Sequence, residues 1–284
     1  MISNVEILYG LANRCNHYGI KKNISNSKIN PLQSILEIVD GLDGAEKYGW
    51  DCNDLKTIKE ISKLNTFTKI DINKYDLNKL NRLIKFHSYD NGKTYLRGIY
   101  IHNKINEKMI EKYNMFNSYI KEKSKIKIGF SIYNQDELNF IIEKNLSFDI
   151  LQIPYNLNVK FDINKLKILK KDIYLRSIFL QGVYFVDLKN KFNDQINKII
   201  TLQKNYLLEK ANLYNVNLGQ YLFSKSISFC QQNGFKGIII GSSSIQRIKD
   251  YIKNHISIKM NEDSLDIKFD IISDYLADPR TWKT

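Results

Sequence analysis

The sequence predicts an α/β protein built as a single-domain (β/α)8 barrel, a TIM barrel, over residues 1–284. Eight short apolar runs follow one another along the chain, and helical patterns separate them. Near-continuous apolar strands that alternate with helices are typical of a parallel sheet covered by helices. Eight such repeats favour closure of the sheet. One barrel of this kind takes about 250 residues, so we expect a single domain.

The eight apolar runs give the expected strands in order. They lie at residues 5–10, 38–42, 67–70, 96–102, 126–131, 148–153, 173–177 and 237–241. Asn134 and Glu137 form a capping box that opens the helix after the fifth strand. Apolar residues repeat at helical spacing after the fifth, seventh and eighth strands, at Leu138, Ile141 and Ile142, at Ile199, Leu202 and Tyr206, and at Ile245, Ile248 and Ile252. No Gly-x-Gly-x-x-Gly follows the first strand, so a doubly wound dinucleotide-binding fold lacks its main support.

The composition is that of a globular protein outside the membrane. Hydrophobic residues make up 43% of the chain, and no uninterrupted apolar run approaches the roughly 18 residues that a membrane span needs. The first residues show no basic segment followed by an apolar core, so we expect no signal peptide. Three scattered cysteines, Cys15, Cys52 and Cys230, indicate reduced thiols. We therefore expect a cytoplasmic protein.

The chain carries 43 basic and 30 acidic residues, a net charge of +13. Such a surplus of positive charge makes nucleic acid a candidate partner. The lysines are spread along the whole chain, however. The densest run, residues 121–127, falls between a predicted helix and a predicted strand, where a solvated connection is the usual interpretation. We expect no nucleic-acid partner, and note that a basic surface would also attract a phosphorylated cofactor.

Four polar residues stand at the ends of consecutive predicted strands. Asp43 and Tyr48 follow the second strand, while Lys69 ends the third and His102 ends the fourth. The carboxyl ends of barrel strands share one face, where the active sites of such barrels lie. A phenol is a weak acid with a pKa of about 10, and a neighbouring lysine makes its proton easier to donate. Each residue alone is more often structural, but their joint placement favours a catalytic group.

These four residues resemble the catalytic tetrad of the aldo-keto reductases, and the resemblance to a bacterial branch of that family covers nearly the whole chain. The matching segments are residues 9–13 (Tyr-Gly-Leu-Ala-Asn), 16–20 (Asn-His-Tyr-Gly-Ile), 129–133 (Gly-Phe-Ser-Ile-Tyr), 151–156 (Leu-Gln-Ile-Pro-Tyr-Asn), 176–182 (Arg-Ser-Ile-Phe-Leu-Gln-Gly) and 278–282 (Asp-Pro-Arg-Thr-Trp). The resemblance implies an NAD(P)H-dependent oxidoreductase that reduces an aldehyde or ketone to an alcohol. In that reaction Tyr48 is the proton donor, Lys69 lowers its pKa, Asp43 orients Lys69, and His102 positions the substrate carbonyl.

The resemblance also implies where the cofactor binds. Ser131 and Gln152 would hydrogen-bond the nicotinamide carboxamide. Small residues at 241–244 open the last helix, where a helix N-terminus favours phosphate. Arg247 would contact the 2′-phosphate of NADP, because a guanidinium binds phosphate with a planar fork of donors. The expected cofactor-binding residues are Gly10, Leu11, Ala12, Ser131, Gln152, Arg176, Ser177, Phe179, Gln181, Gly182, Gly241, Ser242, Ser243 and Arg247.

Some positions depart from the family pattern. Gly44 stands where the family usually has threonine, Arg176 replaces a ring-stacking aromatic residue, and Gly241 replaces a phosphate-binding lysine. Arg247 therefore carries most of the preference for NADP(H), and NAD(H) stays open. The segment 21–37 is short for the first loop and helix of the family, so the barrel flank there is expected to be abbreviated, open or covered by a partner.

Other functions stay open. One is a non-catalytic relative that binds nucleotide and regulates another protein, and another is the nucleic-acid-binding protein that charge alone suggests. Within the enzyme class, an alcohol or sugar dehydrogenase is the alternative. The branch of the family that the chain resembles is linked to sugar metabolism, but the loops that set specificity carry no signature. The sequence therefore identifies neither the physiological substrate nor the oligomeric state.

Of the remaining histidines, we expect His17 and His255 to be structural or on the surface, and His87 to be exposed at a helix end.

Overall fold

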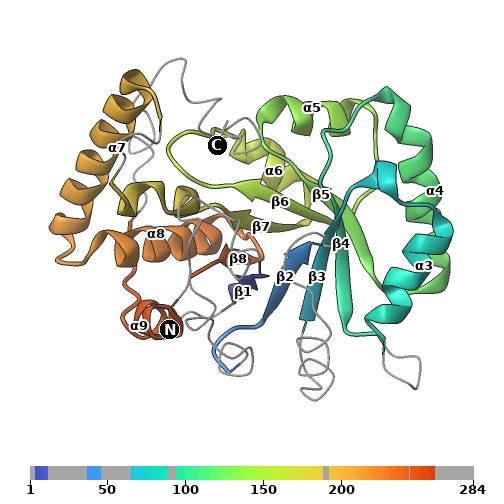
Figure 1. The fold of residues 1–284 in the computed structure, drawn as a ribbon, viewed down its shortest axis with the longest axis horizontal. Coiled ribbons are helices and arrows are strands. Elements are labelled where there is room, and N and C mark those ends of the chain that lie inside the picture. Colours follow the sequence, from blue (N-terminus) through green and yellow to red (C-terminus); the bar gives the residue numbers. More distant parts are fainter. Residues whose placement is uncertain are drawn as a thin grey trace.

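The computed structural model describes residues 4–11, 37–45, 65–88, 94–187, 192–242 and 244–259. Its centre is a closed barrel of eight parallel strands that pair in chain order, with β8 returning to β1. The strands are β1 (Glu6–Gly10), β2 (Gly41–Ala45), β3 (Asn65–Ile70), β4 (Leu96–Ile101), β5 (Lys127–Ser131), β6 (Ile150–Pro154), β7 (Asp172–Arg176) and β8 (Gly237–Ile240). The expected TIM barrel and all eight expected strands are confirmed (Figure 1).

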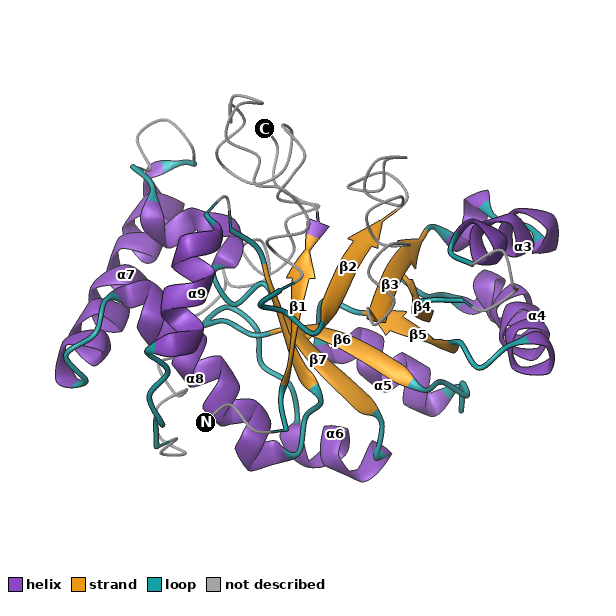
Figure 2. Cartoon of the chain, turned by 90° about the horizontal axis from the view of Figure 1, so that it is seen from below, coloured by secondary structure: helices purple, strands orange, loops and turns teal. Residues whose placement is uncertain are grey.

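In Figure 2 the described helices lie to the left of, to the right of and below the barrel strands. They are α3 (Leu77–Phe86), α4 (Glu107–Lys123), α5 (Gln135–Glu143), α6 (Ile163–Leu169), α7 (Asp194–Leu213), α8 (Leu218–Asn233) and α9 (Ile245–Lys253), with short 3-10 helices η3 (Ile72–Lys74) and η4 (Leu180–Phe185). In both ribbon views α3 and α4 lie on one side of the sheet and α7, α8 and α9 on the other. None of the helices in the described part of the chain is long and apolar enough to cross a membrane.

The expected position of β2 was wrong by three residues. The apolar run at residues 38–42 predicted the strand, but pairing with β1 begins only at Gly41, opposite Leu8. Just before that point the Asp40 carboxylate accepts a hydrogen bond from the Ile7 backbone N–H at 2.7 Å. A side chain therefore pairs with this donor of β1, and regular strand pairing begins one residue later. Asp43 therefore lies inside β2, where the sequence placed it just after the strand.

An apolar layer fills the middle of the barrel. It consists of Leu8, Phe67, Tyr100, Ile150, Tyr174 and Ile239. Two glycines make room for it, because a Cβ on Gly98 would lie 2.5 Å from the Ile150 Cδ1 atom and one on Gly129 would lie 1.7 Å from the Ile150 carbonyl oxygen. The barrel interior is thus a packed core, as it is in this fold generally.

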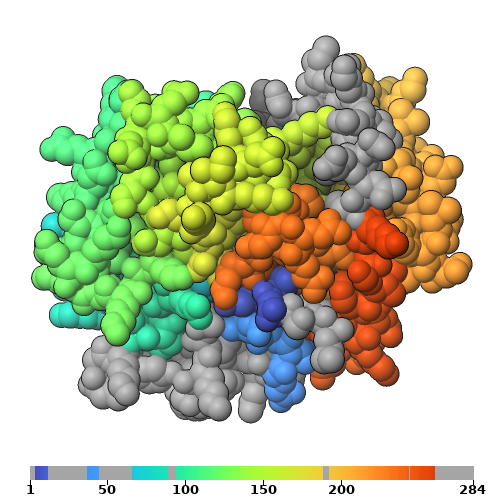
Figure 3. Space-filling view, turned by 180° about the vertical axis from the view of Figure 1, so that it is seen from behind, coloured from blue at the N-terminus to red at the C-terminus, as the bar shows by residue number. Residues whose placement is uncertain are grey.

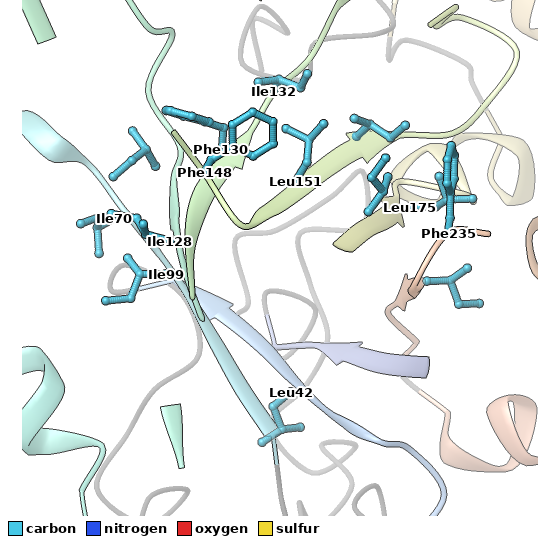
Figure 4. Packing of buried hydrophobic residues seen from close by; sticks show 14 of the residues in the cluster. Leu42, Ile70, Ile99, Ile128, Phe130, Ile132, Phe148, Leu151, Leu175 and Phe235 are labelled. Carbon is cyan, nitrogen blue, oxygen red and sulfur yellow. The ribbon is translucent and has the colours of Figure 1, made fainter. Parts of the chain in front are cut away.

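A second apolar layer fills the space between the strands and the outer helices (Figure 4). Phe130 on β5 lies at its centre, with ring centroids 4.5 Å from Tyr113 and 5.7 Å from Phe148. The predicted helix after β5 is confirmed as α5, and Asn134 caps it by accepting from the Glu137 backbone N–H at 3.0 Å. The Glu137 carboxylate reaches back to the Tyr133 N–H at 2.7 Å, which fixes the chain just after β5.

The connection from β7 to β8 holds two long helices where the sequence predicted one. Ile199, Leu202 and Tyr206 lie on α7 as expected. In α8, every residue from 218 to 230 is buried, so the helix shows no alternation of apolar and polar faces and gave no signal. In the space-filling view, the amber segment that includes α7 lies at the edge of the molecule opposite the green segments (Figure 3).

Candidate active site

Polar residues follow the apolar layer toward the carboxyl ends of the strands. Side chains two apart on a strand point to the same face. Lys69 follows Phe67 by two positions, His102 follows Tyr100, Gln152 follows Ile150, and Arg176 follows Tyr174. The mouth at this end of the barrel is therefore lined by polar side chains directly above the packed core.

Asp43 binds two of these residues. Its Oδ2 atom forms an ion pair with the Lys69 amine, and its Oδ1 atom accepts a hydrogen bond from Gln152 Nε2 at 2.8 Å. The Asp43 carboxylate is 4% exposed, and the Lys69 side chain is 13% exposed. Three strands thus contribute to one buried cluster, although Asp43 and Gln152 are 109 residues apart in the chain.

The protein environment acts on Lys69 in two directions. Burial lowers the pKa of Lys69, and the Arg176 guanidinium lowers it further, whereas the charge and hydrogen bond of Asp43 raise it. The net direction is a lowered pKa. Asp43 therefore serves to keep the ammonium charged in a place where desolvation alone would favour the neutral amine.

His102 follows β4, and its backbone N–H donates to the Ile70 carbonyl at 3.0 Å. Its Nε2 atom lies 3.3 Å from the Tyr133 hydroxyl. Tyr133 in turn lies under Arg176, whose guanidinium carbon is 4.0 Å from the centre of the phenol ring. The structure thus adds Tyr133 to the site, a residue that the sequence marked only as the last letter of the Gly-Phe-Ser-Ile-Tyr match.

Arg176 is held firmly at the mouth. Its Nη2 atom donates to the Ile132 carbonyl at 2.8 Å, and its Nη1 atom donates to Ser177 Oγ at 3.2 Å. The residue is 7% exposed. A buried guanidinium that stacks on an aromatic ring is favourable, and this one joins the ends of β5 and β7.

Ser131 and Gln152 lie opposite each other in the pairing of β5 with β6. Both are buried. Within the described residues, Ser131 Oγ and Gln152 Oε1 have no hydrogen-bond partner. Buried polar atoms almost always have a hydrogen-bond partner. These two oxygens therefore indicate a ligand or a water molecule that would form hydrogen bonds with them.

The segment from Ser177 to Gly182 has an unusual backbone. Ser177, Leu180, Gln181 and Gly182 have φ of 56°, 44°, 51° and 87°. Non-glycine residues rarely adopt positive φ, and such residues cluster at ligand sites. Phe179 anchors the segment through its ring, which lies 5.9 Å from those of Phe185 and Tyr251.

The expected phosphate site lies at the start of α9. Ser244 caps this helix, accepting from the Arg247 backbone N–H at 3.3 Å, and Ser242 Oγ accepts from the Ser244 N–H at 3.1 Å. Gly241 directly follows β8, and Arg247 is exposed on the first turn of the helix. The arrangement leaves a helix N-terminus beside an exposed guanidinium, which suits an anion.

The remaining expected site residues lie at the end of β1 or outside the described residues. Gly10 ends β1, and Leu11 is fully buried in the outer apolar layer. Tyr48, Ala12 and Ser243 lie outside the described residues, so the position of the expected proton donor stays a prediction. In the described ranges, no group of three or more His, Cys, Asp or Glu side chains could hold a metal ion.

The expectation for His87 was wrong. The residue does stand at a helix end, as the C-cap of α3, but it is 0% exposed. The strand-like segment that covers it is joined to it by a hydrogen bond from the Tyr95 N–H to the His87 carbonyl at 3.1 Å. His255 is partly buried, with Nδ1 3.3 Å from Ser224 Oγ, and His17 lies outside the described residues.

Comparison of the sequence with known protein families and with curated proteins finds no match. Solved structures do match. An aldo-keto reductase from a Medee basin deep-sea metagenome library gives a TM-score of 0.61 at 15% identity, covering 99% of this chain and 91% of that one. An aldo-keto reductase of Bombyx mori in complex with NADP gives 0.59 at 16% identity, covering 91% and 86%. The glycerol dehydrogenase of Gluconobacter oxydans gives 0.58 at 10% identity, covering 90% and 93%. The chain therefore has the barrel fold of the solved aldo-keto reductases.

Proposed function

We propose that the protein is an aldo-keto reductase, an oxidoreductase that uses NADP(H) to reduce an aldehyde or ketone to an alcohol. The observation that carries the proposal is the buried cluster at the barrel mouth, in which Asp43 holds both Lys69 and Gln152. A lysine is almost never buried without a partner. A charged amine at this point has a chemical use, because it stabilises a phenolate next to an oxygen that is being protonated.

The residues of the mouth fit a nicotinamide cofactor. A carboxamide carries two N–H donors and one acceptor oxygen, which match the unsatisfied Gln152 Oε1 and the Ser131 hydroxyl. The left-handed segment from Ser177 to Gly182 would hold the pyrophosphate, and the start of α9 with Arg247 would hold the 2′-phosphate of NADP. The cofactor would supply the hydride, and the protein would bind and orient it.

The residues of this chain would then donate the proton and orient the carbonyl of the substrate. Tyr48 would donate its proton to the carbonyl oxygen as negative charge develops there. Lys69 would favour the phenolate that remains, and Asp43 would keep Lys69 charged against the effect of burial. His102 would donate a hydrogen bond that orients the carbonyl. A sugar aldehyde is the first substrate class to test, because the resembled branch is linked to sugar metabolism.

The decisive experiment compares Tyr48→Phe with the wild type. NADPH consumption is followed with a panel of aldehydes, and NADPH affinity is measured separately by fluorescence titration. We expect kcat to fall by about 10²–10⁴-fold, the usual contribution of a general acid, while Kd for NADPH stays unchanged.

Tyr113→Phe is the matched control, since it removes the hydroxyl of a buried tyrosine on α4, outside the mouth, and leaves the proposed proton donor in place. We expect it to retain most of the turnover. Full activity of Tyr48→Phe would contradict the mechanism. NADPH binding by the wild type without any turnover would favour the non-catalytic relative instead.

A further inference from the structure

Tyr133 is a buried phenol at the barrel mouth to which the proposed reaction assigns no role. It follows the last residue of β5 by two positions and is 6% exposed. Its backbone N–H donates to the Glu137 carboxylate of α5 at 2.7 Å. The backbone that carries this phenol is therefore fixed on both sides, by the end of β5 and by the first turn of α5.

The ring of Tyr133 is fixed as well. The Arg176 guanidinium lies over its face, with the carbon atom 4.0 Å from the ring centre. Arg176 is itself held by the Ile132 carbonyl, to which its Nη2 atom donates at 2.8 Å. A guanidinium that stacks on an aromatic ring away from water is favourable, so the hydroxyl of Tyr133 has a defined position.

That hydroxyl contacts His102. Its oxygen lies 3.3 Å from His102 Nε2, and the two ring centres are 5.7 Å apart with their planes tilted by 43°. His102 directly follows β4, which pairs with β5 in the barrel. Two residues that lie 31 positions apart in the chain thus form a side-chain contact at the mouth.

The contact bears on which nitrogen of His102 carries the proton. A neutral imidazole has its proton on one nitrogen only, and the hydrogen bonds of the ring decide which one. His102 Nδ1 is buried, so Nε2 is the nitrogen that can act on a substrate, and it must carry the proton to donate to a carbonyl oxygen. A hydroxyl oxygen that accepts from Nε2 favours this tautomer.

We propose that Tyr133 is a positioning residue, whose hydroxyl oxygen accepts the Nε2–H of His102 and holds that ring ready for the substrate. The inference rests on the proposed reductase function, in which His102 orients the carbonyl. At 3.3 Å the contact is longer than most N–H···O hydrogen bonds, which span roughly 2.7–3.2 Å. A carbonyl oxygen that approaches Nε2 more closely would therefore displace the phenol as acceptor.

The first test is made on the free protein and needs no turnover. Nitrogen-15 NMR of the histidine side chains identifies the protonated nitrogen of each neutral ring. The chain has only four histidines, and the signal of His102 is the one lost in His102→Gln. At about pH 8.5, well above the ordinary histidine pKa of about 6.5, we expect the wild type to hold His102 in the Nε2–H form. Tyr133→Phe keeps the ring under the guanidinium and should give a mixture of both tautomers.

Tyr113→Phe is the matched control, since it removes a buried hydroxyl that donates to the Ser147 carbonyl instead. It should leave the His102 signals as they are in the wild type.

Kinetics test whether the hydroxyl acts through His102. Tyr133→Phe should lower kcat/KM for an aldehyde by about 2–10-fold, the range expected for one neutral hydrogen bond, while Kd for NADPH stays unchanged. In the His102→Gln background the same substitution should cause no further fall. A hydroxyl that only supported the packing of the mouth would lower kcat/KM in both backgrounds.

The inference is wrong if the wild type holds His102 in the Nδ1–H form, if Tyr133→Phe keeps the wild-type tautomer, or if the two substitutions lower kcat/KM additively. Absence of turnover in the wild type would instead refute the reductase function, and the tautomer of His102 would still decide whether Tyr133 positions the ring.

Discussion

Acidification should destabilise the protein through His87. The ring is fully buried at the end of α3, with its centroid 5.3 Å from that of Phe86 and 5.4 Å from that of Tyr95. Burial lowers the pKa of His87 from 6.5 to about 4. The unfolded chain therefore takes up a proton at this residue at pH values where the folded protein does not.

The size of the effect follows from these two pKa values. Between pH 6.5 and pH 4 the unfolded state binds more protons, so the free energy of unfolding falls as the pH falls through this window. A pKa difference of about 2.5 corresponds to about 3 kcal/mol. About 2 kcal/mol of this is lost between roughly pH 7 and pH 5. Well above pH 6.5 the ring is neutral in both states, and the effect vanishes.

Urea unfolding at neutral and acidic pH measures this loss in the wild type, His87→Phe and Tyr95→Phe. Comparing the variants cancels all other titrating groups. We expect the wild type to lose about 2 kcal/mol more than His87→Phe on acidification. Tyr95→Phe keeps the histidine and removes only a neighbouring hydroxyl, so it should behave as the wild type does. If all three proteins lose the same free energy, His87 titrates in the folded state as it does in the unfolded chain, and the reasoning from burial fails.

Two further predictions concern the barrel core and the cofactor. Gly129→Ala should lower the free energy of unfolding in urea by about 1–3 kcal/mol or more, because its Cβ would meet the Ile150 carbonyl oxygen at 1.7 Å; unchanged stability would contradict the close approach of β5 and β6. Arg247→Ala should weaken NADPH binding by about tenfold or more while changing NADH binding little. Fluorescence titration checks this, with Lys249→Ala, an exposed cation on the same helix, as control; equal NADPH and NADH affinities in the wild type would remove the assignment of NADP.

The strands could be predicted because a barrel buries both faces of its sheet. Continuous apolar runs such as residues 99–101 and 238–240 have no solvent-facing side and are directly recognisable as strands. Complete burial also explains why α8 was not predicted, since a helix that is buried on all sides has no polar face by which the sequence could reveal it. His87 was misjudged for a related reason, because the Tyr95 segment that covers it is not a neighbour that helix periodicity reveals.

The gathering of Asp43, Lys69 and Gln152 at one mouth could also be predicted, because alternation along a strand and closure of the barrel bring every inward-facing strand end to one mouth. What the sequence could not provide is which of these side chains touch. The family resemblance implies two separate roles: Lys69 lowers the pKa of the proton donor Tyr48, and Gln152 binds the cofactor. In the closed barrel, the two oxygens of Asp43 bind one of these residues each. The carboxylate that favours the charged form of the lysine therefore also fixes the amide of Gln152, and the two roles that the resemblance implies would be linked through Asp43 because β2, β3 and β6 converge.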